Sequence, residues 1–243
     1  MPTIPRPRHT TTAGIAVLVA ALIFASLGHA AVSGMTYRFD ARILLALRQS
    51  GDLAIPRGPQ WLFRALRDIT ALGDTPVLTL VTVVAAGLAV LRRRVGMAVF
   101  IAVTVAVGAI LDTQMKLAFA RPRPSVVPHL VEVTSASFPS GHAMNSTIVY
   151  LTLAALLARQ MPDRRSQIYI GSVGIALALV IGASRVYLGV HYPTDVVGGW
   201  LAGAAWALAC WLVASRWLAV AMPGGVRAEA LPSPAHPAKA REP

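Results

Sequence analysis

Long apolar runs, separated by short polar breaks, are the feature that most constrains the fold of this chain. A helix needs roughly 20 mainly apolar residues to cross a hydrocarbon core about 30 Å thick. Six stretches approach that length, with approximate bounds Thr12–Val32, Thr75–Leu91, Val95–Met115, Ala143–Ala158, Ile168–Val186 and Val196–Trp217. The pattern therefore predicts an all-α fold, a six-span transmembrane helix bundle.

The composition favours one membrane domain. Hydrophobic residues make up 56% of the chain and charged residues 13%, whereas a soluble domain carries about 25% charged residues. Because the apolar runs recur at near-even spacing, we expect residues 1–222 to form a single membrane domain. Residues 223–243 are rich in Pro and Ala and are predicted to be disordered. The single cysteine, Cys210, excludes an intrachain disulfide framework and a cysteine-rich metal site.

The first apolar run has some features of a signal peptide. It follows Arg6 and Arg8 and ends near Gly28-His29-Ala30, which has the small residues of a signal-peptidase site. Cleavage is therefore an alternative. We expect a retained helix, because five remaining spans would place the two chain ends on opposite sides of the membrane.

The net charge of +12 raises the possibility of nucleic-acid binding. The 22 basic residues, however, lie between the apolar runs. That placement suits topogenic charges and attraction to anionic lipid headgroups, so we expect the bilayer as a partner and no nucleic acid. The sequence leaves the oligomeric state open.

Two short basic loops indicate the orientation in an inner or plasma membrane. The positive-inside rule places residues 92–94 and 159–165 in the cytoplasm. Alternation then places both termini in the cytoplasm, and residues 112–140 and 184–195 on the periplasmic or extracellular face. Residues 33–74 contain six arginines and yet fall outside, which opposes this assignment.

Residues 33–74 also contain a mixed apolar and basic pattern. Ile43, Leu44 and Leu47 are interspersed with Arg42 and Arg48. Such a pattern is typical of an amphipathic helix that lies in the membrane interface. We therefore expect an interfacial segment between the first and second spans.

Three polar clusters stand out against the apolar background, and the first is Lys116-Leu-Ala-Phe-Ala-Arg121-Pro122-Arg123-Pro124. Each proline interrupts a helix and favours an extended backbone at the arginine before it. Arg123 can therefore fold back towards Lys116, and both groups suit phosphate oxygens. A basic juxtamembrane anchor is the alternative interpretation.

The second cluster is Phe138-Pro139-Ser140-Gly141-His142, directly before the fourth apolar run. Ser140 can cap the helix, and Gly141 lets a ligand approach the backbone. The free amides of the first helical turn then form an anion site beside His142. A simple helix cap followed by an interfacial histidine is the alternative.

The third cluster contains Ser184-Arg185, then His191 and Asp195, and links the fifth and sixth runs. A spacing of four residues brings His191 and Asp195 together on one helix face. An aspartate in that place can fix the tautomer of the imidazole, as a nucleophile or a base requires. A structural hydrogen bond is the alternative. The predicted topology places all three clusters on one membrane face, where they can share a pocket.

These clusters, in this order, resemble the three-part signature of the type 2 phosphatidic acid phosphatase superfamily. That signature reads Lys, six residues, Arg-Pro; then Pro-Ser-Gly-His; then Ser-Arg, five residues, His, three residues, Asp. Every position is filled within residues 116–195, by Lys116, Arg123, Pro124, Pro139, Ser140, Gly141, His142, Ser184, Arg185, His191 and Asp195. The resemblance implies a membrane phosphatase whose substrate is a lipid phosphomonoester or diphosphate, of the phosphatidic acid, phosphatidylglycerol phosphate or undecaprenyl diphosphate class.

The resemblance also implies a mechanism that uses no metal or other cofactor. His191 attacks phosphorus to form a phosphohistidine and is oriented by Asp195, while His142 protonates the leaving oxygen and later activates water. Arg121 is an auxiliary cation beside the motif, with lipid headgroup contact as its alternative role. The phosphoryl oxygens are held by Lys116, Arg123, Ser140, Gly141 and Arg185. From the residues alone, Asp112 is predicted to form an ion pair with Lys116, one turn away.

Other functions stay open at this point. A phosphohistidine can be attacked by a lipid acceptor, which would make the protein a lipid phosphotransferase. The superfamily also includes soluble vanadium haloperoxidases, but six apolar spans argue against that activity. A non-enzymatic lipid transporter is the alternative from another class, although no related halves with broken spans are visible.

Overall fold

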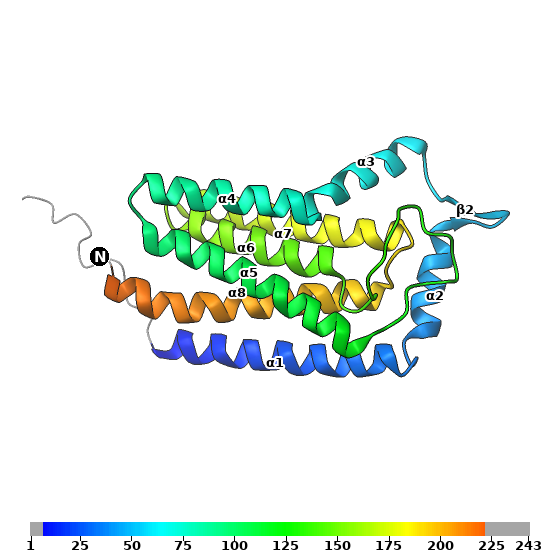
Figure 1. The fold of residues 1–243 in the computed structure, drawn as a ribbon, viewed down its shortest axis with the longest axis horizontal. Helices are drawn as coiled ribbons and strands as arrows, with labels where there is room; N and C mark the ends of the chain where they lie inside the picture. The colour runs from blue at the N-terminus through cyan, green and yellow to red at the C-terminus, as the bar shows by residue number, and fades with distance from the viewer. Residues whose placement is uncertain (1–6, 222–243) are drawn as a thin grey trace, which may run out of the picture.

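The computed structural model describes residues 7–221 and shows a bundle of long helices with shorter elements at one end (Figure 1). All bundle helices run roughly along the long axis of the molecule. In chain order the elements are α1 Pro7–Val32, α2 Tyr37–Ala46, β1 Arg48–Gln49, β2 Asp52–Pro56, α3 Gln60–Thr70, the 3₁₀ turn η1 Ala71–Gly73, α4 Thr75–Leu91, α5 Val95–Phe119, α6 Gly141–Ala158, α7 Arg164–Tyr187 and α8 Pro193–Ala221.

Five helices of the described chain are long and apolar enough to cross a membrane: Thr11–Val32, Val95–Phe119, Gly141–Ala158, Arg164–Tyr187 and Pro193–Ser215. This confirms the prediction of a mostly helical membrane bundle. α4 has 17 residues and makes a sixth candidate only together with α3, from which it is bent by 52°. The count of six spans therefore stays a prediction.

α6 lies inside the bundle, where it packs against α5, α7 and α8. The contact with α8 is close because α8 has glycine where a side chain would collide. A Cβ atom at Gly199 would lie 2.6 Å from the Ser140 carbonyl oxygen, and one at Gly203 would lie 2.6 Å from the Met144 carbonyl oxygen. Small residues of this kind let membrane helices approach each other. The start of α6 is thereby fixed against the start of α8.

The two short basic loops lie together at one end of the bundle, where the Arg94 guanidinium donates to Oε1 of Gln160 at 3.3 Å. The segments that carry the three polar clusters lie at the other end, with α2, β2 and the long α5–α6 connection (Figure 1). The predicted separation of basic loops and polar clusters is thus confirmed. The compartment that each end faces stays a prediction.

The segment between α1 and α4 differs from its prediction. Leu44 on α2 is fully buried and packs with Val127 and Tyr192. Arg48 is 1% exposed, and its guanidinium donates to the Tyr187 carbonyl oxygen at 2.8 Å. These two side chains pack onto the end of the bundle and do not face lipid, while the interfacial position of the segment as a whole stays a prediction. The predicted disordered tail, residues 223–243, lies outside the described residues.

Candidate active site

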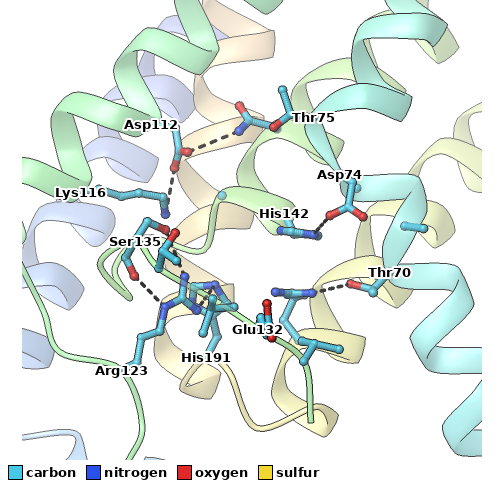
Figure 2. A pocket seen from close by; sticks show the side chains of 18 of the residues that line it. Thr70, Asp74, Thr75, Asp112, Lys116, Arg123, Glu132, Ser135, His142 and His191 are labelled. Carbon is cyan, nitrogen blue, oxygen red and sulfur yellow. Dashed lines mark hydrogen bonds and ion pairs between the residues drawn. The ribbon is translucent and has the colours of Figure 1, made fainter. Parts of the chain in front are cut away.

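A cavity of about 440 Å³ opens at the end of the bundle that carries the polar clusters (Figure 2). It brings together side chains from α5, α6, α7, the α5–α6 connection and the bend between α3 and α4. Six of the residues that the resemblance assigns to the site line it: Lys116, Arg123, Gly141, His142, Arg185 and His191. The predicted convergence of the three clusters in one pocket is therefore confirmed.

His191 lies in the short turn between α7 and α8 and is 2% exposed. Nη1 of Arg123 is 3.2 Å from its Nε2 atom. Because a guanidinium only donates hydrogen bonds, Nε2 is the unprotonated nitrogen and Nδ1 carries the proton. Burial lowers the pKa of His191 to about 3, so its ring is neutral at pH 7. The lone pair at the cavity is the form that a nucleophile needs.

Asp195 lies behind His191 and is fully buried. Its Oδ2 atom is 3.5 Å from Nδ1 of His191 and also accepts from Oγ of Ser137 at 2.5 Å and from the Tyr192 amide at 2.9 Å. His191 precedes α8, which begins at Pro193. The pair therefore meets through the turn at the start of α8, not on a helix face as predicted.

Arg121 is buried, with 4% exposure, and lies on the far side of Asp195. Its guanidinium donates to Oδ1 of Asp195 at 2.5 Å and to Oδ2 of Asp40 at 2.9 Å. Its Cζ atom lies over the ring of Tyr192, 4.1 Å from the ring centroid. Contact with lipid headgroups is therefore the wrong interpretation for Arg121. It occupies one oxygen of Asp195, so that the other oxygen faces His191.

Arg123 reaches the cavity through the extended backbone that the prolines impose. Its Nε atom donates to the Ser135 carbonyl oxygen at 2.6 Å, and Nη1 donates to the Val190 carbonyl oxygen at 2.7 Å. Burial lowers the pKa of Arg123, while the charge of Asp195 opposes that shift. Since its hydrogen-bond partners are neutral, the charge of Arg123 stays available for an anion.

The other two cations of the cavity are anchored differently. Lys116 forms the predicted ion pair with Asp112, at 3.4 Å, and donates to the Pro139 carbonyl oxygen. Nη1 of Arg185 donates to Oγ1 of Thr70 at 3.0 Å. Its buried Nε atom has no hydrogen-bond partner within the described chain. Arg185 thus retains donor capacity for a phosphate oxygen.

Ser140 and Gly141 stand at the start of α6 in different roles. A Cβ atom at Gly141 would lie 2.8 Å from Oδ2 of Asp112 and 3.3 Å from Cε of Lys116, so a side chain there would displace the ends of both of these side chains. Ser140 occupies the N-cap position, but its side chain makes no capping hydrogen bond. Its Oγ atom is buried, has no partner among the described residues and does not line the cavity. The predicted cap by Ser140 is therefore wrong.

His142 has a partner that the sequence did not reveal. Its Nε2 atom is 2.6 Å from Oδ1 of Asp74, which lies at the bend between η1 and α4 (Figure 2). In the sequence, Asp74-Thr75-Pro76 has the form of an ordinary helix start. One feature of the sequence could have indicated a partner for Asp74: the chain has only 10 acidic residues, and an acid near a lipid environment is costly without a partner. Asp40, in the first turn of α2, likewise has the form of an ordinary acid near a helix start.

The comparisons agree with this geometry. The model of the PAP2 superfamily matches residues 95–218. Phosphatidylglycerophosphatase B of Bacillus subtilis is 34% identical over 164 residues, which cover 64% of this chain and 79% of the relative. An undecaprenyl-diphosphatase of Sulfolobus acidocaldarius is 35% identical over 116 residues, covering 46% of this chain and 51% of the relative.

A solved structure shares most of this fold. It is the crystal structure of a transmembrane PAP2 type phosphatidylglycerolphosphate phosphatase from Bacillus subtilis, with a TM-score of 0.73 and 27% sequence identity. The superposition covers 82% of this chain and 96% of that chain. The family model matches just over half of this chain, and the relatives and the converging clusters agree with it, so the chain belongs to the PAP2 superfamily, within which it is similar to membrane lipid phosphatases.

Proposed function

We propose that this membrane lipid phosphatase hydrolyses its substrate by double displacement at Nε2 of His191. One observation carries the proposal: the 3.2 Å contact between Nη1 of Arg123 and Nε2 of His191. It identifies the unprotonated nitrogen and places it beside a cation in the cavity. A phosphate held by Arg123 would therefore have its phosphorus within reach of the His191 lone pair.

In the first step, Nε2 of His191 forms a bond to phosphorus and the ester P–O bond breaks. His142 donates a proton to the leaving oxygen, so the lipid is released as an alcohol. The intermediate is a phosphohistidine on His191, whose imidazolium is stabilised by Asp195 through Nδ1. Arg121 holds Asp195 in place from behind.

In the second step, water attacks phosphorus while His142 takes back a proton. The P–N bond breaks, inorganic phosphate leaves, and Nε2 of His191 regains its lone pair. The sum is one ester and one water converted into one alcohol and one phosphate. Both steps leave the charge on the nonbridging oxygens, which Lys116, Arg123 and Arg185 stabilise.

Gly141 contributes through its backbone. The first turn of α6 has free amide groups that point towards the cavity end of the helix, and the helix dipole favours an anion there. Since a side chain at Gly141 would collide with Asp112 and Lys116, the glycine keeps the backbone accessible to a phosphate oxygen. Ser140 acts in this proposal through the backbone position that it gives to Gly141.

The orientation in the membrane follows from the basic loops. Residues 92–94 and 159–165 lie at the cytoplasmic end, so the cavity opens on the periplasmic or extracellular face. α4, extended by α3 through the bend, is the second of six spans, and both termini are cytoplasmic. The phosphate of a lipid in the outer leaflet lies at the level of such a cavity.

The substrate is a lipid phosphate ester. We take phosphatidylglycerol phosphate, a phosphomonoester, as the first candidate, because relatives with extensive coverage of both chains carry that activity in their names. Phosphatidic acid, also a phosphomonoester, is a second candidate. Undecaprenyl diphosphate is a third; there the P–O–P bond would break and the leaving group would be the lipid monophosphate in place of an alcohol.

The test is a phosphate-release screen with purified protein in detergent. Phosphatidylglycerol phosphate, phosphatidic acid and undecaprenyl diphosphate are each supplied to the wild type and to His191→Ala, in the presence of a chelator. We expect release from at least one lipid by the wild type and none by the variant. Brief incubation with a ³²P-labelled lipid, followed by alkaline denaturation, should trap label on wild-type protein alone.

Two outcomes would overturn the proposal. One is absence of release from all three lipids, and the other is undiminished release by His191→Ala. Analysis of the lipid products distinguishes hydrolysis from phosphotransfer, because transfer to an added lipid acceptor yields a new phospholipid in place of inorganic phosphate.

A further inference from the structure

We infer that Asp74 is the positioning residue for His142. Its carboxylate accepts a hydrogen bond from Nε2–H of His142, which leaves Nδ1 as the nitrogen that exchanges a proton with the leaving group and water. The inference rests on the proposed function, in which His142 serves as acid and then as base. It adds a second carboxylate–imidazole pair to the site. The two residues lie 68 positions apart in the chain, and Asp74 precedes the region that the family model matches.

The contact between the two side chains is short and direct. Nε2 of His142 and Oδ1 of Asp74 are 2.6 Å apart, which is typical of a charge-assisted hydrogen bond. A histidine that must give and take a proton at one nitrogen has its tautomer set by the hydrogen bond at the other. With Nε2–H directed at Asp74, Nδ1 is the atom that changes its protonation during the reaction.

Asp74 makes this contact instead of a local one. It occupies the N-cap position of α4, where an aspartate side chain usually accepts from a backbone amide of the first turn. No such capping bond forms, although it would stabilise the helix by about 1 kcal/mol. Asp74 thus contacts His142 in the cavity without making the capping hydrogen bond that its position favours, and such departures from local preference are expected at functional sites.

The bend that carries Asp74 is fixed to the helices of the site. The hydroxyl of Tyr150 on α6 donates to the Leu72 carbonyl oxygen at 2.8 Å, and Thr70 accepts from Arg185 on α7. Gly73 is packed so closely that a Cβ atom there would lie 2.5 Å from Cγ2 of Ile181. The position of the Asp74 carboxylate is thus determined by α6 and α7, which also carry His142 and the phosphate-binding cation.

The charges around His142 explain why it needs a carboxylate. Arg185 from α7 and Lys116 from α5 face the imidazole, and both disfavour a positive charge on it. Asp74, from the bend between α3 and α4, supplies the opposing negative charge at contact distance. The carboxylate therefore offsets part of this repulsion when His142 carries the proton for the leaving oxygen.

The experiment compares Asp74→Asn, Asp74→Ala and Asp74→Glu with the wild type on two substrates. One is the lipid phosphate that the screen identifies, whose alkoxide leaving group needs a proton. The other is p-nitrophenyl phosphate, whose leaving group does not. We expect Asp74→Asn to lower kcat on the lipid by about 10–100-fold, as loss of part of the acid catalysis predicts, with KM nearly unchanged.

Three further readouts separate positioning from a purely structural role. The loss on p-nitrophenyl phosphate should be below about 3-fold. The basic limb of the pH–rate profile should move to lower pH in Asp74→Asn, and Asp74→Glu should restore part of the activity. The matched control is Asp68→Asn, which removes a charge from an exposed side chain on α3 and should leave kcat within about 2-fold.

The inference is overturned if Asp74→Asn retains the wild-type rate, or if it loses equal factors on both substrates with an unchanged pH profile. A second measurement does not depend on turnover. In ¹⁵N-histidine-labelled protein, with the His142 signal assigned through His142→Gln, Nε2 should be protonated in the wild type and Nδ1 and Nε2 should share the proton in Asp74→Asn. If the wild type hydrolyses no phosphate ester, the proposed function fails; an Nδ1-protonated His142 overturns the Asp74 inference separately.

Discussion

The site contains two histidine–aspartate pairs that differ in almost every physical respect. His191 and Asp195 are four residues apart and buried, with side-chain exposures of 2% and 0%. His142 and Asp74 come from distant parts of the chain and are accessible from the cavity, with side-chain exposures of 21% and 47%. Both pairs have cations nearby, but the first is enclosed by additional hydrogen bonds from Ser137, Tyr192 and Arg121, whereas the second opens to the cavity.

The difference matches the two kinds of work in the proposed mechanism. A nucleophile must present one lone pair in one direction, which burial and fixed partners accomplish. An acid and base must change its charge twice in each cycle, which requires contact with solvent and substrate. The same two side-chain types therefore serve different steps because their surroundings differ.

Neutralising each aspartate in turn tests whether the two pairs have different roles. Asp195→Asn should lower kcat on the lipid substrate by about 10⁴-fold, because the amide cannot hold the required tautomer of a buried nucleophile. Asp74→Asn should lower it by only about 10–100-fold. Steady-state rates at pH 7 measure both, and equal losses in the two variants would contradict the distinction.

A second prediction concerns the support behind the buried pair. Arg121→Met leaves the buried carboxylates of Asp40 and Asp195 without their cation, which should cost about 3–5 kcal/mol of stability. Thermal unfolding in detergent measures the loss. The double variant Asp40→Asn with Arg121→Met should recover part of it.

The control for that experiment is Arg67→Met, which breaks the exposed Arg67–Asp68 ion pair and should cost less than about 1 kcal/mol. A similar stability loss in both variants would show that the buried network has no special role. Among the described residues no Lys or Arg forms an ion pair with Asp74 as Arg121 does with Asp195, so we expect a large loss of stability only at the buried pair.

The protonation behaviour of His191 is the third prediction. Because burial lowers its pKa to about 3, His191 should stay neutral as the pH falls from 8 to 4. Below its ordinary pKa of about 6.5 an exposed histidine would already be charged. ¹⁵N chemical shifts of labelled histidine, assigned through His191→Gln, report the charge directly. Titration of His191 near pH 6.5 would contradict the buried, neutral state that the mechanism requires of the nucleophile.

The smallest expected effect concerns the anchoring of the bend. Thr70→Val removes one hydrogen bond that the charged Arg185 guanidinium donates, worth about 1.5 kcal/mol, and should raise KM about 10-fold with kcat nearly unchanged. Tyr150→Phe removes a comparable bond to the Leu72 carbonyl and should affect kcat more than KM, because it loosens the position of Asp74. Identical changes in the two variants would argue against this division.

Sequence patterns predicted the features that depend on near neighbours. The apolar runs indicated the bundle helices, and the three clusters indicated a shared cavity because alternating spans return to the same end. The ion pair of Asp112 and Lys116 followed from their helical spacing. Each of these needs only local structure and the topology of a membrane bundle.

Contacts between distant segments were not accessible in that way. Asp74 has a sufficient local explanation as a helix cap, and Arg121 has one as a membrane anchor, so neither pattern pointed to its partner. The amphipathic pattern around Leu44 and Arg48 cannot distinguish a lipid interface from the surface of the same protein, since both bury an apolar face. Tertiary packing decided all three cases.

The carboxylates that complete the site lie outside the family-defining region. Asp40 balances Arg121 behind the nucleophile, and Asp74 contacts His142, yet both precede residues 95–218. A chimera that joined those residues to the N-terminal third of a relative would keep every signature residue. It would function only if the N-terminal third of the relative supplied one carboxylate that reaches Arg121 and another at the mouth of the cavity beside His142. Compatibility between the two parts of such a hybrid is thus an electrostatic condition that motif matching does not report.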